Sequence, residues 1–274
     1  MEPVSAKAVW QLWSAVRERG PLVQCITNYV AMDISANVLL AAGASPAMAH
    51  ALDEVEDFVG ISSALLVNMG TLSADWVAAM KLAAGRAAAK GTPWVLDPVG
   101  CGATPYRTAA CLAMLRLRPA VVRGNASEIL ALAGAAGNVK GVDSTASSHE
   151  ALDAAKAVAK ANGCVVAVSG ATDLITDGER VIGVSNGVEL LTLITAAGCS
   201  VTALIGAFLA VAPEGAVMEA TAAALAVFGL AGEKGLAAAP RKGPGSLRVG
   251  LLDYLHLMGE GDVLSGVNVR ELEA

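Results

Sequence analysis

The stretch PWVLDPVG at residues 93–100 runs from a short apolar segment into a polar turn, and AVVRGNASE at residues 120–128 repeats this pattern. The first turn carries Asp97, and the second ends in Glu128 at the expected start of a helix. In an open parallel sheet, the carboxyl ends of neighbouring strands meet at one crevice. Two carboxylates, an arginine and an asparagine in such a crevice suit a magnesium-bound polyphosphate. The two segments therefore predict a parallel α/β sheet with a phosphoryl-transfer site at its edge.

The remainder of the chain alternates apolar runs with helical patterns, which is typical of a parallel sheet covered by helices. A single α/β domain is predicted over residues 1–274, with a mixed sheet edge and a loosely ordered polar tail at 259–274. Residues 134–148 are rich in Gly, Ser, Thr and Asn and predict a loop. Strands are expected at 22–27, 45–49, 64–68, 94–97, 120–123, 164–169 and 190–194, with a hairpin at 173–184. Helices are expected at 5–19, 31–42, 53–61, 73–90, 107–117, 127–132, 149–162, 199–212, 215–236 and 247–258.

Composition and charge argue against several classes of function. The chain has 274 residues, of which 55% are hydrophobic and 4% aromatic, and its net charge is −6. Scarce aromatic side chains and a negative charge argue against a nucleic-acid partner. Only 16% of the residues are charged, so we expect part of the surface to be buried in an oligomer.

Cysteine use and hydropathy bear on location. Five cysteines without a C-x-x-C spacing predict reduced thiols in a cytoplasmic protein rather than a zinc or disulfide site. The uncharged segment 190–213 is long enough to span a bilayer, but Gly198-Cys199-Ser200 interrupts it and no basic flank marks a cytoplasmic side. We therefore expect a buried strand, turn and helix there, and no membrane partner.

The two acidic turns have both functional and structural interpretations. Asn125 and Glu128 share the first turn of a predicted helix, where free N–H groups suit phosphate. Glu128 can organise Mg²⁺, or it can simply cap the helix. Asp97 is a candidate metal-side carboxylate, or a turn-capping aspartate. Arg123 is a candidate phosphate ligand, or a solvated surface arginine.

The turn TAAGC at residues 195–199 is the second candidate site. Its small residues let the backbone approach a phosphoryl group, and N–H groups at Gly198 and Cys199 can form an anion hole. A position at a helix N-terminus predicts a lowered pKa for the Cys199 thiol, although a structural cysteine is the alternative.

Polar groups after three other expected strands predict a small substrate pocket. Asn28, Met48 and the segment 68–71 supply amide contacts and an apolar floor, or they are ordinary turn and core residues. Ser169 ends a further strand, where it can approach nucleotide phosphates.

Six segments together resemble those of the hydroxyethylthiazole kinase family, which belongs to the ribokinase-like superfamily. The resemblance extends over residues 20–258. The six segments are QCITNYV at 24–30, GASPAMAH at 43–50, VNMGTL at 67–72, DPVGCGAT at 97–104, RGNASE at 123–128 and GPGS at 243–246. The resemblance implies a three-layer sandwich, with helices on both faces of a mostly parallel sheet. It also implies a homotrimer with active sites at subunit interfaces.

The resemblance implies Mg²⁺-dependent transfer of phosphate from ATP to 4-methyl-5-(2-hydroxyethyl)thiazole in thiamine salvage. Met48, Ala196 and Asn28 would then contact the thiazole, whereas Arg123 and Ser169 would contact ATP. Asp97 and Glu128 would serve Mg²⁺. Cys199 would take the place that a catalytic aspartate has in related sugar kinases, and the N–H groups of Gly198 and Cys199 would hold the γ-phosphoryl group.

One segment departs from the family pattern, and alternatives stay open. The family turn usually reads TGTGC, whereas residues 195–199 read TAAGC. Ala196 places a Cβ where glycine can adopt a positive φ, so the anion hole is expected to shift slightly. A kinase for hydroxymethylpyrimidine or pyridoxal is one alternative function. A thiazole- or nucleotide-binding protein without turnover is another.

Overall fold

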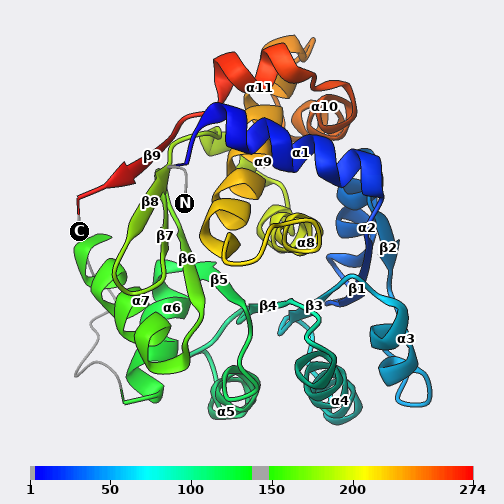
Figure 1. The fold of residues 1–274 in the computed structure, drawn as a ribbon, viewed down its shortest axis with the longest axis vertical. Coiled ribbons are helices and arrows are strands. Elements are labelled where there is room, and N and C mark those ends of the chain that lie inside the picture. The colour runs from blue at the N-terminus through cyan, green and yellow to red at the C-terminus, as the bar shows by residue number, and fades with distance from the viewer. Residues whose placement is uncertain (1–3, 138–147, 274) are drawn as a thin grey trace.

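A nine-stranded mixed sheet forms the centre of the molecule, in the order β2-β1-β3-β4-β5-β6-β7-β8-β9 (Figure 1). The computed structural model describes residues 4–137 and 148–273. Strands β2 to β6 pair in parallel, and β6 to β9 pair antiparallel. The strands are β1 (Leu22–Ile26), β2 (Ser45–Ala47), β3 (Ala64–Asn68), β4 (Trp94–Asp97), β5 (Val121–Asn125), β6 (Val165–Ser169), β7 (Asp173–Thr176), β8 (Val181–Val184) and β9 (Val269–Leu272).

The central strands β3 and β4 are buried along their whole length because both faces of the sheet are covered, and their residues are apolar up to the polar strand ends. Every residue of β3 and β4 is buried, as expected for parallel strands packed between two helical layers. The mostly parallel α/β sheet predicted from the sequence is therefore confirmed.

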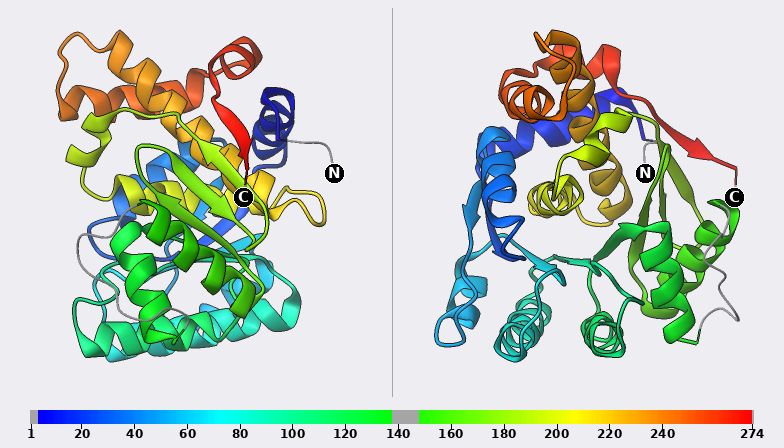
Figure 2. Two further views of the ribbon diagram at one scale, coloured as in Figure 1. Left: turned by 90° about the vertical axis from the view of Figure 1, so that its left-hand side faces the viewer. Right: turned by 180° about the vertical axis from the view of Figure 1, so that it is seen from behind.

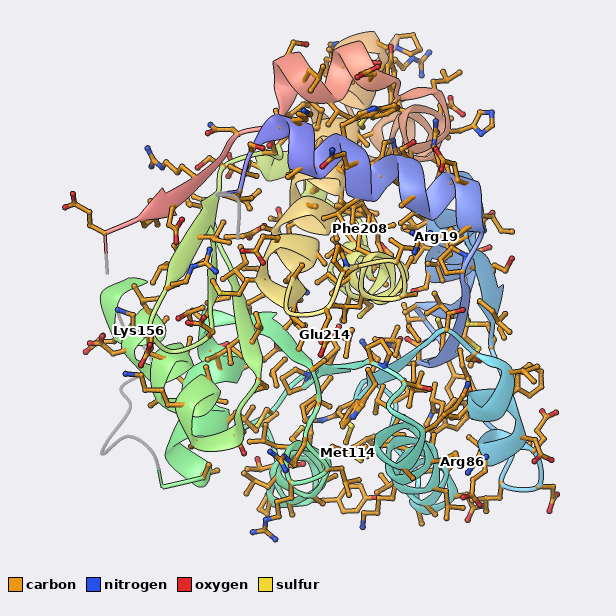
Figure 3. The ribbon with its side chains drawn as sticks, viewed as in Figure 1. Arg19, Arg86, Met114, Lys156, Phe208 and Glu214 are labelled. Atoms are coloured by element: carbon orange, nitrogen blue, oxygen red, sulfur yellow. The ribbon has the colours of Figure 1, made fainter. Side chains whose placement is uncertain are left out.

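Helices form a layer on each face of this sheet (Figures 1 and 2). One core packs α1, α2, α8, α9 and α10 against the sheet and includes Phe208, whereas the other packs α3 to α7 and includes Met114. Figure 3 shows these two side chains on opposite sides of the sheet. The helices are α1 (Ala6–Arg19), α2 (Met32–Ala41), α3 (Val55–Ile61), α4 (Ala74–Lys90), α5 (Pro105–Leu115), α6 (Ala126–Ala135), α7 (Ser148–Asn162), α8 (Ala197–Leu209), α9 (Val217–Ala238), α10 (Pro244–Leu257) and α11 (Glu260–Gly266).

Parallel pairing brings the polar strand ends to one edge. Asn68 at the end of β3 lies opposite Asp97 at the end of β4, and Asn125 of β5 lies opposite Ser169 of β6. Helix α8 packs on β1, β3 and β4. The turn that begins α8 therefore reaches the same edge.

Two predicted elements differ from the structure. The expected strand at 190–194 is wrong, because the chain forms the 3-10 helix η1 (Glu189–Leu193), in which no residue is fully buried. Its apolar run mimics a strand, yet Leu193 is 65% exposed. The tail is not loose over its described part: α11 and β9 form there, and β9 extends the sheet by pairing with β8.

The remaining predictions concern a loop, a hairpin and a membrane span. The hairpin at 173–184 is confirmed as β7 and β8. Most of the loop predicted at 134–148 lies outside the described residues, and its first two positions belong to α6.

In the described part of the chain, α9 is the one helix long and apolar enough to cross a membrane, and 78% of its most apolar window is buried inside the protein. Such burial is typical of a core helix. The assignment of residues 1–274 to one domain stays a prediction.

Candidate active site

A network of buried hydrogen bonds lies at the carboxyl ends of the parallel strands. It joins the turn after β1, the ends of β3 and β4, and the start of α8. Asn28 Nδ2 donates to Asn68 Oδ1 at 2.8 Å and to Cys199 Sγ at 3.5 Å. Asn68 Nδ2 donates to Asp97 Oδ2 at 2.9 Å, and the hydroxyl of Thr202 also lies 2.9 Å from this oxygen. The amide oxygen of Asn28 accepts the N–H groups at the start of the turn into α2. Every one of these side chains is therefore held in a single orientation.

Asp97 lies inside this network of hydrogen bonds, with the side chains of Asn68 and Thr202 against it. It is 1% exposed, and burial raises the pKa of its carboxyl to about 7. The positive charge of Arg123 and hydrogen bonds from Thr202 and Asn68 oppose this rise, whereas the nearby charge of Glu128 adds to it. Asp97 is thus neither a surface turn cap nor a freely solvated carboxylate, and added positive charge would favour its ionised form.

Glu128 has the capping role that the sequence offered as an alternative. Asn125 and Glu128 form a reciprocal capping box at the start of α6, with each side chain accepting the other residue's backbone N–H at 2.9 Å. The second carboxylate oxygen, Oε1, accepts the N–H of Gly100 at 2.9 Å. Glu128 therefore also joins the loop after β4 to the start of α6. No group of three or more His, Cys, Asp or Glu side chains that can hold a metal occurs among the described residues.

The backbone at Ala196, in the turn before α8, has the positive φ that the family pattern led us to expect. Ala196 has a φ of 60° and a ψ of 15°, which lie in the left-handed region that favours glycine. The helix starts at the next residue, so the N–H groups of its first turn face the sheet edge.

Arg123 lies beside this helix start. A Cβ added to Gly198 would stand 2.7 Å from Nη1 of Arg123. The guanidinium makes no hydrogen bond with the described residues, and its buried Nε has no partner. Arg123 is thus not the solvated surface residue of the alternative interpretation.

The pKa predicted for Cys199 is wrong in direction. Burial, followed by the charge of Asp97, raises the pKa of its thiol to about 11. With a pKa of about 11, the thiol carries its proton at neutral pH. Cys199 is the least buried of the five free cysteines.

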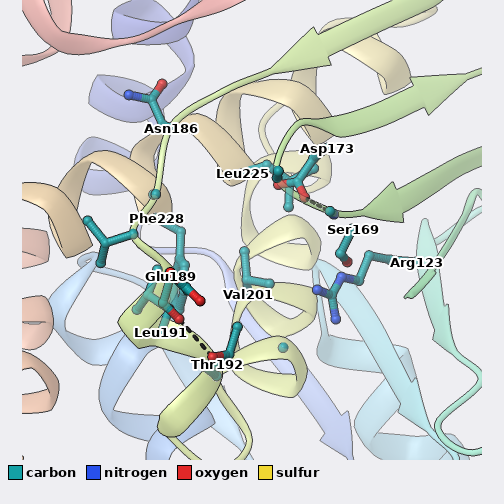
Figure 4. A pocket seen from close by; sticks show the side chains of 17 residues that line it. Arg123, Ser169, Asp173, Asn186, Glu189, Leu191, Thr192, Val201, Leu225 and Phe228 are labelled. Atoms are coloured by element: carbon teal, nitrogen blue, oxygen red, sulfur yellow. Dashed lines mark hydrogen bonds between the residues drawn. The ribbon is translucent and has the colours of Figure 1, made fainter. Parts of the chain in front are cut away.

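A cavity of about 630 Å³ opens between β6, η1, α8 and α9. Figure 4 shows Arg123 and Ser169 at one end and Leu191 and Phe228 at the other, with Val201 between them. The hydroxyl of Ser169 donates to Gly124 O at 3.3 Å, a long hydrogen bond that is readily exchanged for another partner. The apolar end of this cavity was missed by the sequence interpretation, because Phe228 is an ordinary core residue of α9 and Leu191 was expected in a strand.

Two other predicted substrate residues, Met48 and Ala196, pack against one of the two cores. Met48 is half-buried. The carbonyl of Met48 lies 3.2 Å from the ring nitrogen of His50, and that ring stacks on Trp76. The structure therefore brings Asn28, Asp97, Cys199, Gly198 and Arg123 into one network or into neighbouring positions. Thr202, which belongs to this network, was not predicted, since a threonine inside an apolar helix gives no local signal.

Known proteins resemble this chain over almost its full length. A hydroxyethylthiazole kinase of Zea mays is 58% identical over 264 residues, which are 95% of this chain and 92% of the relative. A hydroxyethylthiazole kinase of Arabidopsis thaliana is 51% identical and covers 97% of this chain and 96% of the relative.

Solved structures give the same result for the fold. A hydroxyethylthiazole kinase structure from Pyrococcus horikoshii OT3 aligns with a TM-score of 0.90 at 42% identity, covering 97% of this chain and 100% of that chain. The structure of pyridoxal kinase from Staphylococcus aureus in complex with AMP-PCP and pyridoxal aligns with a TM-score of 0.62 at 16% identity, covering 93% of this chain and 99% of that chain. At this low identity, the alignment shows a shared ribokinase-like fold and nothing about function. The hydroxyethylthiazole kinase family matches residues 13–260. The chain therefore belongs to the hydroxyethylthiazole kinase family.

Proposed function

We propose that this protein transfers the γ-phosphoryl group of ATP to the hydroxyl of 4-methyl-5-(2-hydroxyethyl)thiazole, a step of thiamine salvage. Membership of the kinase family and the names of its relatives support the reaction and the acceptor alcohol. The polar network at the sheet edge supplies a place where the two substrates can meet.

The observation that carries the proposal is the position of Arg123. Its guanidinium lies against the start of α8 and makes no hydrogen bond with the described residues. A cation beside the positive end of a helix dipole is unfavourable unless an anion lies between them. A phosphate there would accept hydrogen bonds from the guanidinium fork and from the N–H groups of α8.

The remainder of the nucleotide fits the cavity beside Arg123. Ser169 lies at the phosphate end, and the volume of about 630 Å³ is within the range of small-ligand sites. Leu191, Val201 and Phe228 line the other end, where an apolar base is favoured over further phosphate.

Asp97 and Glu128 are the residues that would hold Mg²⁺. Oδ1 of Asp97 takes no hydrogen bond from the described residues, whereas both oxygens of Glu128 already accept backbone N–H groups. This donor set suits direct binding by Asp97 and binding through water by Glu128. The ion would supply positive charge to offset the charge that develops on the phosphoryl oxygens.

The residues around Cys199 position the acceptor alcohol in this proposal. Asn28 donates to the thiol, and Met48 and Ala196 provide apolar surface nearby. Because the pKa of Cys199 is raised to about 11, the thiol does not act as a general base at neutral pH. Catalysis then depends on alignment and charge stabilisation, as is usual for phosphoryl transfer.

A single methyl group added to Gly198 tests the site. Thiazole-dependent ADP release is measured for the wild type and for Gly198→Ala, whose Cβ would meet the guanidinium of Arg123. We expect kcat/KM for ATP to fall at least about tenfold, since one charge-assisted contact is worth roughly 1.5–3 kcal/mol. Gly85→Ala is the control, because nothing lies within 4 Å of a Cβ there. Full activity of Gly198→Ala, or no thiazole-dependent ADP release by the wild type, would contradict the proposal.

A homotrimer in the cytoplasm belongs to the same proposal. Tyr29 and Val30 follow Asn28 directly and are 66% and 58% exposed, so an apolar surface adjoins the predicted acceptor site. All five cysteines are free, which suits a reducing compartment. Light scattering should give three times the chain mass for the wild type and a smaller mass for Val30→Asp. A monomeric wild type would contradict this part of the proposal.

A further inference from the structure

The hydroxyl of Thr202 lies between two parts of the candidate active site that are far apart in sequence. Its Oγ1 is 2.9 Å from Asp97 Oδ2 at the end of β4. The same Oγ1 is 2.9 Å from the carbonyl oxygen of Gly198 in the first turn of α8. Thr202 is 0% exposed, so water does not compete for either contact.

The contact with Asp97 joins α8 to β4, whereas the contact with Gly198 lies within α8. The two elements are also linked through Asn28, which donates to Cys199 Sγ and to Asn68, and through Asn68, which donates to Asp97. Asn68 holds Asp97 from the side of β3, and its own orientation is set by the N–H of Gly70 at 3.0 Å. The Thr202 hydroxyl holds the same carboxylate oxygen from the side of α8. Asp97 is thereby located relative to the N–H groups at the start of α8 and to Arg123 beside them.

We propose that Thr202 is a positioning residue for phosphoryl transfer, which holds the Asp97 carboxylate at a set distance from the first turn of α8. This inference rests on the proposed function. The phosphoryl group must be aligned between the groups at Asp97 and those at Gly198, and a shift of about 1 Å is enough to slow such a reaction a hundredfold. Thr202 touches neither substrate and acts through the residues that do.

A purely structural role is the competing explanation. Threonine hydroxyls inside helices often bond the carbonyl four residues earlier, without any functional consequence. Thr221 in α9 is such a case: it is 0% exposed, its hydroxyl donates to Val217 O at 2.8 Å, and it hydrogen-bonds no carboxylate among the described residues. Thr221 is therefore a matched control for the loss of a buried hydroxyl.

Three variants separate the two explanations. Thr202→Val removes the hydroxyl with little change of volume, Thr202→Ser retains it, and Thr221→Val removes the control hydroxyl. For Thr202→Val we expect kcat to fall about 10- to 100-fold while KM for both substrates stays within about threefold. Thr202→Ser should recover kcat to within about threefold of the wild type. Thr221→Val should retain kcat even where its thermal midpoint falls as far as that of Thr202→Val.

A second measurement does not depend on the identity of the substrates. Cys199 lies in the same first turn of α8, whereas the other four cysteines are buried. Iodoacetamide labelling of the ligand-free protein, with mass spectrometry to locate the modified thiol, reports on that turn. We expect the labelling rate of Cys199 to change at least about threefold in Thr202→Val and to stay at the wild-type value in Thr202→Ser and Thr221→Val, because a turn released from Asp97 exposes its thiol differently.

The outcomes distinguish this inference from the proposed function. The positioning role is overturned if Thr202→Val keeps kcat and the labelling rate of the wild type, if Thr202→Ser is as impaired as Thr202→Val, or if Thr221→Val loses as much kcat. A changed labelling rate in Thr202→Val, together with a wild type that forms no ADP with the thiazole alcohol, would contradict the proposed function and would still support the tie between Thr202, Asp97 and α8.

Discussion

Ala196 carries backbone strain at the edge of the active site. Its φ of 60° lies in the left-handed region, which costs an L-residue with a Cβ roughly 1–2 kcal/mol. Glycine adopts this conformation without the clash, although it also gives the unfolded chain more freedom. The strain therefore arises from one methyl group, which glycine would remove together with the packing of that methyl against the core.

Ala196→Gly is expected to raise the free energy of unfolding by about 0.5–1 kcal/mol, the difference between relieved strain and added chain entropy. It is also expected to preserve or raise kcat. Urea denaturation and ADP release measure the two effects. Ala197→Gly is the control, because Ala197 begins α8 with ordinary helical geometry, and there glycine should destabilise the protein. A destabilised Ala196→Gly, or a large fall in its kcat, would show that the turn requires alanine.

The burial of Asp97 makes the stability of the folded protein depend on pH. Burial raises the pKa of its carboxyl from the usual 3.8 to about 7. Below the pKa of the unfolded state, both states carry the proton and stability is unaffected. As the pH rises to about 7 the unfolded state loses its proton first, so the folded protein is progressively destabilised.

Asp97→Asn should therefore stabilise the ligand-free protein at pH 8 by about 2–4 kcal/mol and abolish most of its activity. The gain in the free energy of unfolding should shrink as the pH falls from 8 to 5, which denaturation at several pH values measures. Asp53→Asn, which alters an exposed carboxylate, should show no such gain. Equal stability of Asp97→Asn and the wild type at pH 8 would argue against a costly buried charge.

At the scale of elements, α9 and α10 approach one another at a pair of glycines. A Cβ added to Gly235 would lie 2.5 Å from the carbonyl carbon of Gly250, and a Cβ on Gly250 would lie 2.8 Å from the Cα of Gly235. Both obstacles are backbone atoms, which cannot rotate away as a side chain can. The two helices are therefore packed at a separation that only glycine permits.

Gly235→Ala should lower the free energy of unfolding by at least about 2 kcal/mol, because either the helices must separate or the core must open. Gly85→Ala in α4 should instead raise it by about 1 kcal/mol, since its Cβ would meet nothing within 4 Å and alanine favours helix. Thermal denaturation of both variants decides the matter. A Gly235→Ala protein as stable as the wild type would show that the helix pair adjusts freely.

At the scale of the whole molecule, Arg180 closes the antiparallel side of the sheet. It lies just before β8 and donates to Glu271 of β9 at 2.8 Å and to Glu219 of α9 at 3.0 Å. The side chain of Glu219 is only 8% exposed. One guanidinium thus joins the last strand and a core helix to the hairpin.

Arg180→Ala is expected to lower the free energy of unfolding by about 2 kcal/mol, because the buried carboxylate of Glu219 loses its partner. Lys234→Ala breaks the more exposed pair with Asp262 at 2.6 Å and should cost less than about 1 kcal/mol. Chemical denaturation compares them. The double variant Arg180→Ala/Glu219→Ala should recover part of the loss; a double variant less stable than Arg180→Ala would contradict the unpaired-charge explanation.

Local sequence was sufficient for most elements and failed where local signals conflict. The caps of α4 and α6 and the Asp-Gly hairpin follow from residues three or fewer positions apart, so they are readable from sequence. The run 190–194 is as apolar as a strand, yet it forms η1 and takes no place in the sheet. The polar tail gives a weak local signal, yet β8 offers it an open sheet edge.

The sequence by itself determined the alternation of strands and helices and the polar strand ends, because these depend on periodicity and on the residue types that follow each apolar run. The positive φ at Ala196 was expected only from comparison with the family turn TGTGC, since alanine gives no local signal for it. Tertiary structure alone decided that Asp97 is buried with a raised pKa, that Cys199 is a protonated thiol, and that Thr202 joins Asp97 to α8. Burial and electrostatic interaction arise between residues that are a hundred positions apart in the chain. They exist only once the sheet has brought those residues to the same edge.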